Sequence, residues 1–185
     1  ASEYAAAGVT TAQSGLASEQ IIQGLSFVKM LGFVPQRLVL WPDMETGERW
    51  AAEDFDAQRY RSDEVSIGAV KLIADGSIQG YTGYLSKPYH VHSHDHDDSY
   101  RGYATMPQEE LNARVLAMHG AGLQIAVHAN GDAAIESVIT AVAQAQAQAP
   151  REDARHIVIH SQMATQDQLL KMQRLGLTPS FFSAH

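Results

Sequence analysis

Short apolar segments and longer amphipathic segments alternate along the chain. The apolar segments are rich in β-branched residues and end at glycine, proline or a polar cluster, which is typical of strands. Six strands with their turns are predicted, at residues 8–15, 37–42, 66–77, 123–132, 155–162 and 177–185. The run 38–41 is continuously apolar, as in a parallel strand that is covered on both faces. The pattern therefore predicts an α/β protein with a parallel sheet.

Capping residues mark the helices between these strands. Four helices are predicted, at residues 18–32, 106–118, 133–149 and 165–175. Ser18 is a candidate N-cap, and Pro107 with the acidic residues after it predicts the first turn of the second helix. Residues 77–104 show no periodicity, so they predict a long polar loop of the type that often covers a binding site.

Composition narrows the function classes. With 185 residues, 45% of them hydrophobic and 18% charged, the chain is long enough to form a globular core. The formal net charge of -8 disfavours nucleic acid as a partner, and no apolar run reaches the roughly 20 residues that cross a membrane. The absence of cysteine leaves histidine, carboxylate or modified lysine as metal ligands, and it fits a cytoplasmic protein.

Two parallel α/β architectures fit this element order. A nucleotide-binding sheet would carry a GxGxxG or GxxxxGK[ST] turn after its first strand, and neither pattern is present. A (β/α)8 barrel predicts polar functional residues at the carboxyl ends of several strands. Four such residues occur here: Asp75, His128, His160 and His185. The sequence therefore favours a (β/α)8 TIM barrel of which about six of the eight strands are present.

Three strand residues are costly to bury. Lys71, His128 and His160 each stand between apolar neighbours, and desolvating such a side chain without a partner costs several kcal/mol. Each one alone could be a core histidine with a hydrogen-bond partner or, for Lys71, a strand-end side chain that reaches solvent. Because the three lie on separate strands, a divalent ion held by imidazoles, with an open position for water, accounts for all of them together.

The same segments resemble a known family. The chain resembles the amidohydrolase superfamily in three consecutive blocks: VKLIADGSIQGYTGYLSKPY, LQIAVHANGDAAIESVITA and RHIVIHSQMATQDQLLKMQRLGLTPSFFSAH. The segment GVTTAQSG, nearer the start of the chain, resembles an earlier block of the same family. The branch that it resembles is amidohydrolase family 3, with N-substituted formamide deformylases and exoenzyme-regulator-like hydrolases. The resemblance implies a metal-dependent hydrolase that cleaves a carbon–nitrogen bond of a small amide-type substrate, such as an amide or N-formyl group.

The resemblance also implies metal ligands. In the family, a carboxylated lysine of strand four bridges two metal ions, and single histidines close strands five and six. The matching residues are Lys71, His128 and His160, and zinc is the expected metal.

Three further residues match polar positions of the family. Asp75 and Asp132 are expected either to shape loops or to orient the metal ligands through hydrogen bonds. The alternative is that they only form turns. His185 falls where the family often has a histidine near the substrate.

Parts of the family's site have no counterpart in this sequence. The HxH pair of the first strand and the general-base Asp of the eighth are missing, and Ile159 stands where the family usually has a carboxylate. We therefore expect residues 1–185 to be a partial barrel from strand two to strand seven, and we expect the fragment itself to be inactive.

Two alternatives of other classes remain open. The open sheet edges of a partial barrel would favour self-association into a homo-oligomer without catalysis. The other alternative is a metal-binding module in the loop 90–98, where four histidines alternate with other residues and acidic side chains follow. These histidines are His90, His92, His94 and His96. A solvated loop without metal is the plainer interpretation, and the identities of the substrate and of the metal stay open.

Overall fold

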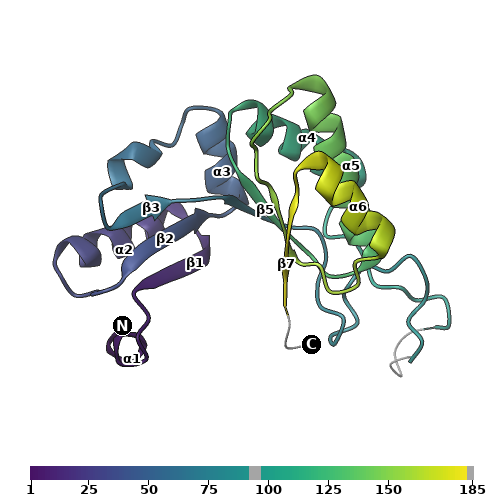
Figure 1. The fold of residues 1–185 in the computed structure, drawn as a ribbon, viewed down its shortest axis with the longest axis horizontal. Coiled ribbons are helices and arrows are strands. Elements are labelled where there is room, and N and C mark those ends of the chain that lie inside the picture. Colours follow the sequence, from purple (N-terminus) through teal and green to yellow (C-terminus); the bar gives the residue numbers. More distant parts are fainter. Residues whose placement is uncertain (92–96, 183–185) are drawn as a thin grey trace. The chain divides into compact units, whose positions relative to one another are not determined.

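The computed structural model describes residues 1–91 and 97–182 (Figure 1). The chain divides into two compact units, Ala1–Lys71 and Leu72–His185. Each unit contains a parallel β-sheet with helices beside it. No helix of the described residues is long and apolar enough to span a membrane. The cytoplasmic location stays a prediction.

The first unit is built on a three-stranded parallel sheet in the order β1-β2-β3. Its elements are α1 (Ser2–Ala6), β1 (Thr11–Ala17), α2 (Glu19–Met30), β2 (Arg37–Pro42), α3 (Met44–Ala51), the 3-10 helix η1 (Ala57–Tyr60) and β3 (Val65–Ile67). Its core includes Ile22 of α2 and Leu40 of β2, both fully buried. Ser18 caps α2 as predicted, because its side chain accepts a hydrogen bond from the N–H of Ile21.

The second unit holds a sheet in the order β4-β5-β6-β7, along which α4, α5 and α6 pack (Figure 1). Its elements are β4 (Val70–Ile73), whose first two residues still belong to the first unit, α4 (Gln108–Gly120), β5 (Ile125–Ala129), α5 (Asp132–Gln148), β6 (Ile157–His160), α6 (Gln166–Leu175) and β7 (Thr178–Phe181). Apolar side chains from β5 and α5, among them Ile125, Ile135 and Val142, are buried in its core. The parallel pairing places the carboxyl ends of these strands at one edge of the sheet.

The sequence pattern does not predict α3, which lies in a polar stretch after β2. Asp43 caps this helix by accepting a hydrogen bond from the N–H of Thr46 at 2.9 Å. Gly47 in its middle is a poor helix former, but a Cβ at this position would lie 2.1 Å from Cγ1 of Val70. The close packing of α3 against Val70 therefore requires a glycine at position 47, although glycine has a low helix propensity.

The predicted strand 66–77 is two strands in the structure. β3 pairs with β2, and Gly68 extends this pairing by donating to the carbonyl of Leu40. β4 then belongs to the second sheet, beside β5. The α/β class and the parallel pairing are confirmed. Neither sheet closes on itself among the described residues, so the (β/α)8 architecture of a single partial domain stays a prediction.

Candidate metal centre

Two of the predicted ligands, His128 and His160, lie side by side in the second unit. β5 and β6 pair in parallel, with His128 opposite Ile159 and Ala129 opposite His160. The centroids of the two imidazole rings are 4.6 Å apart, and the ring planes make an angle of 78°. The carboxyl ends of two neighbouring strands therefore present two imidazoles in contact.

The backbone at His160 departs from the extended conformation. Side chains alternate between the two faces of a strand, so a fully extended His160 would share a face with its register partner Ala129 rather than with His128. Instead, His160 has a φ of 73°, and Ser161 follows with a φ of 48°. Left-handed backbone costs about 1–2 kcal/mol for a non-glycine residue, and such strain is concentrated at functional sites. Here the strain coincides with the contact between the two rings.

His128 makes its polar contacts through one ring nitrogen. Its Nε2 lies 2.8 Å from the carbonyl oxygen of Gly76. The side-chain Nδ2 of Asn130 donates to the same carbonyl at 2.8 Å and lies 3.1 Å from Nε2. Oδ1 of Asp75 is 3.6 Å from Nε2, which is beyond hydrogen-bond distance. The His128 side chain keeps 19% of its surface exposed, so the ring is reachable while Nε2 is engaged.

Asp75 is fully buried next to this contact. Its Oδ1 accepts a hydrogen bond from the N–H of Asn130 at 2.9 Å, and its Oδ2 accepts from the N–H groups of Gly131 and Tyr84 at 2.8 and 2.9 Å. Burial raises the pKa of Asp75, and the three backbone donors oppose that increase. The carboxylate thus ties the turn after β4 to the turn after β5.

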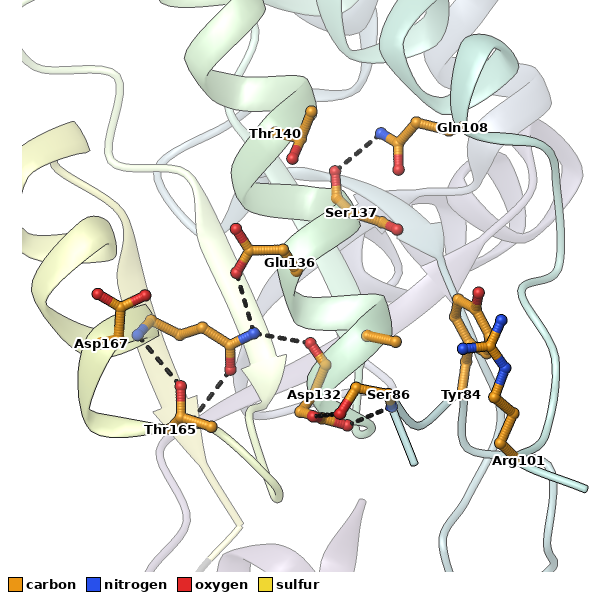
Figure 2. A pocket seen from close by; sticks show the side chains of 12 residues that line it. Tyr84, Ser86, Arg101, Gln108, Asp132, Glu136, Ser137, Thr140, Thr165 and Asp167 are labelled. Carbon is orange, nitrogen blue, oxygen red and sulfur yellow. Dashed lines mark hydrogen bonds between the residues drawn. The ribbon is translucent and has the colours of Figure 1, made fainter. Parts of the chain in front are cut away.

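Asp132 is bound elsewhere. It begins α5, and its carboxylate accepts hydrogen bonds from the N–H of Ser86 at 2.8 Å and from the Ser86 hydroxyl (Figure 2). Gln168 donates to the carbonyl of Asp132 at 2.7 Å and to Glu136 at 3.1 Å. These residues border a polar pocket of about 500 Å³ beside α5. The side chain of Asp132 therefore binds Ser86 in the loop before α4, and not His128 or His160.

The third predicted ligand, Lys71, ends the first unit and is half-buried. Burial lowers the pKa of its ammonium group to about 8, because desolvation disfavours the charged form. His185 and the loop histidines His92, His94 and His96 lie outside the described residues, and His90 is exposed. In the part of the chain that the structure describes, no three His, Asp or Glu side chains are placed to hold a metal ion together.

Sequence reasoning missed three residues of this region. Asn130 and Gly131 form an Asn-Gly pair directly after β5, which is a turn signal that could have drawn attention to them. Ser86 lies in a loop without periodicity, and nothing in the sequence marked it as the partner of Asp132.

Comparisons with known proteins bear on this site. Among protein families, the one described as the amidohydrolase family matches residues 1–185. YtcJ of Bacillus subtilis (strain 168), a provisionally named amidohydrolase, is 29% identical over 158 residues, which are 83% of this chain and 27% of YtcJ.

Two solved structures share the fold. They are uncharacterized metal-dependent hydrolases from Pyrococcus furiosus and Pyrococcus horikoshii OT3, with TM-scores of 0.78 and 0.76 at 22% and 23% identity. Each match covers 97% of this chain, and 36% and 34% of the two relatives respectively. The chain thus spans little more than a third of the solved relatives and about a quarter of YtcJ. Because the family match covers the whole chain, this protein belongs to the amidohydrolase family.

Proposed function

We propose that the intact protein is a metal-dependent hydrolase that cleaves a carbon–nitrogen bond, such as that of an amide or N-formyl group, and that this chain supplies part of the metal site. The observation that carries the proposal is the contact between His128 and His160 at the carboxyl ends of β5 and β6. Functional residues of α/β barrels gather at this end of the strands. Family membership and the likeness to two metal-dependent hydrolases support the proposal.

The donor set suits zinc. Two adjacent imidazoles in a chain without cysteine are nitrogen ligands of the kind that zinc binds in hydrolases. A bound zinc ion would polarise the substrate carbonyl and lower the pKa of water at the site to about 7. Within this chain, His128 and His160 would hold the ion, and Lys71 would be a further ligand.

Lys71 would serve as a ligand after carboxylation. In that reaction the neutral amine adds to CO2, a nitrogen–carbon bond forms and one proton leaves, so a buried cation becomes an anionic carbamate with two oxygen donors. The lowered pKa of Lys71, about 8, increases the fraction of amine that can react near neutral pH.

Turnover is proposed for the longer protein. The chain spans 27% of YtcJ, and the family's first-strand histidines and eighth-strand Asp have no counterpart in this sequence. The 185-residue chain is therefore expected to bind zinc weakly and to hydrolyse amides at no measurable rate.

Equilibrium dialysis against zinc tests the proposal. We expect His128→Ala and His160→Ala each to weaken zinc binding by about 100-fold or more, because each removes one of few ligands. Lys71→Ala is expected to weaken it as well. The control is a deletion of residues 90–98, which removes the histidine-rich loop. Zinc binding that survives both histidine substitutions and disappears with the deletion would refute the proposal in favour of a loop metal site.

A second candidate is self-association through the sheet edges. In its own unit β1 pairs only with β2, and among the described residues β7 pairs only with β6. Leu16 on β1 and Phe181 on β7 expose 52% and 59% of their surfaces. An unpaired strand with exposed apolar side chains favours pairing with another chain. We propose a homo-oligomer formed through one of these edges.

Light scattering after size exclusion tests this candidate. The wild-type chain is expected to gain mass as its concentration rises, whereas Leu16→Lys or Phe181→Lys should shift the protein to monomer, because a charge on an edge strand opposes pairing. A wild-type chain that stays monomeric at all concentrations would exclude it.

A further inference from the structure

Side-chain to backbone hydrogen bonds run in both directions between the turn after β4 and the turn after β5. The side chain of Asp75 accepts hydrogen bonds from the backbone N–H groups of Asn130 and Gly131. In return, the side chain of Asn130 donates to the backbone carbonyl of Gly76. Asn130 is 4% exposed and Asp75 is fully buried, so this exchange is protected from water. The Gly76 carbonyl therefore has a fixed direction beside His128.

That carbonyl determines which nitrogen of His128 carries a proton. The Gly76 oxygen can only accept, and it lies 2.8 Å from Nε2 of His128. Nε2 is therefore the protonated nitrogen of the neutral ring, and Nδ1 keeps its lone pair. The 3.1 Å separation between Asn130 Nδ2 and His128 Nε2 then reflects two donors that converge on one oxygen. The ring of His160 also contacts His128, and Oδ1 of Asp75 lies 3.6 Å from its Nε2.

We infer that Asn130 is a positioning residue which, through the Gly76 carbonyl, fixes His128 in its Nε2–H tautomer and leaves Nδ1 as the atom that binds the metal ion. The inference rests on the proposed function for the ion, but the tautomer is a property of the metal-free chain. A ligand histidine whose other nitrogen donates to a carbonyl is held in orientation as well as in tautomer.

Nitrogen NMR of the histidine rings tests the tautomer directly. In metal-free, 15N-histidine-labelled protein, the two ring nitrogens of a neutral imidazole have distinct shifts that identify the protonated one. The His128 signals are assigned by their loss in His128→Gln. We expect the Nε2–H pattern in the wild-type chain and a mixture of tautomers in Asn130→Ala.

Zinc titration of the same samples tests the positioning role. Asn130→Ala is expected to weaken zinc binding by about 10–100-fold. In the zinc-loaded wild-type chain, the His128 Nδ1 signal should shift while Nε2 keeps its proton. The matched control is Gln168→Ala, which removes another buried side-chain amide, 5% exposed, that donates to Asp132 and Glu136. It should change stability without changing the tautomer of His128 or the zinc affinity.

The outcomes separate this inference from the proposed function. An Nδ1–H pattern in the wild-type chain overturns the inference without any variant, and so does zinc affinity in Asn130→Ala within twofold of wild type. If the alanine variant does not fold, Asn130→Leu fills nearly the same volume without the donor and replaces it. A chain with the Nε2–H tautomer that binds no zinc contradicts the proposed function and the metal-binding part of the inference, and leaves only the tautomer standing.

Discussion

Replacing Gly131 with alanine is expected to lower the free energy of unfolding by about 3 kcal/mol or more. A Cβ at this position would lie 1.9 Å from the carbonyl oxygen of Tyr84 and 2.4 Å from its carbonyl carbon. Backbone cannot give way as the end of a side chain can, so the loop at Tyr84 would have to move. Tyr84 and Gly131 donate to the same oxygen of Asp75, and that movement would leave a buried carboxylate short of donors.

Urea denaturation of the two glycine variants tests this expectation. The matched control is Gly24→Ala, because Gly24 lies inside α2 with no atom within 4 Å of an added Cβ. That change should raise stability by up to about 1 kcal/mol, since alanine favours helix over the unfolded chain. A Gly131→Ala protein that loses less than about 1 kcal/mol would show that the Tyr84 loop yields easily and that the contacts around Asp75 are not rigid.

Periodicity and apolar runs sufficed to predict most of the fold. Residues 38–41 of β2 form the continuously apolar run that predicted this strand, and the helix that Ser18 caps begins where the pattern predicts it. The same rule of strand ends drew attention to His128 and His160, because parallel strands bring their carboxyl ends to one edge. Local pattern could not show the left-handed backbone at His160, which brings its ring to His128.

Sequence reasoning selected His160, at the carboxyl end of β6, and gave no role to His156, which directly precedes the strand. It could not show what His156 contacts. His156 meets His119, 37 residues away on α4, and this contact exists only in the folded protein. His119 and His156 therefore contribute to the stability of the fold.

Two buried histidines form a chain of hydrogen bonds at the amino ends of β5 and β6. The N–H of Ile125 donates to Nδ1 of His156 at 3.1 Å. Nε2 of His156 must then carry the proton, and it donates to Nδ1 of His119 at 2.8 Å. Nε2 of His119 in turn donates to the carbonyl of Ala149 at 2.7 Å. Every ring nitrogen is satisfied only while both rings are neutral.

Acidification is therefore expected to destabilise the protein through His156. Burial, with His119 and then Arg151 adding to it, lowers the pKa of His156 from 6.5 to about 3. Between these values the unfolded chain binds one more proton than the folded chain, so stability rises with pH across this window and is lost as pH falls. At pH 4, two and a half units below the unfolded pKa, the loss is about 3 kcal/mol.

Urea denaturation between pH 7 and pH 4 measures this loss, and His156→Gln isolates it from the carboxylates that titrate in the same range. The glutamine variant should be less stable than wild type at pH 7 and should lose about 3 kcal/mol less on going to pH 4. His90→Gln, a change of an exposed histidine outside this chain of hydrogen bonds, should follow the wild-type curve. Parallel curves for wild type and His156→Gln would mean that His156 is protonated in the folded protein, and the bond from Ile125 would then have to break.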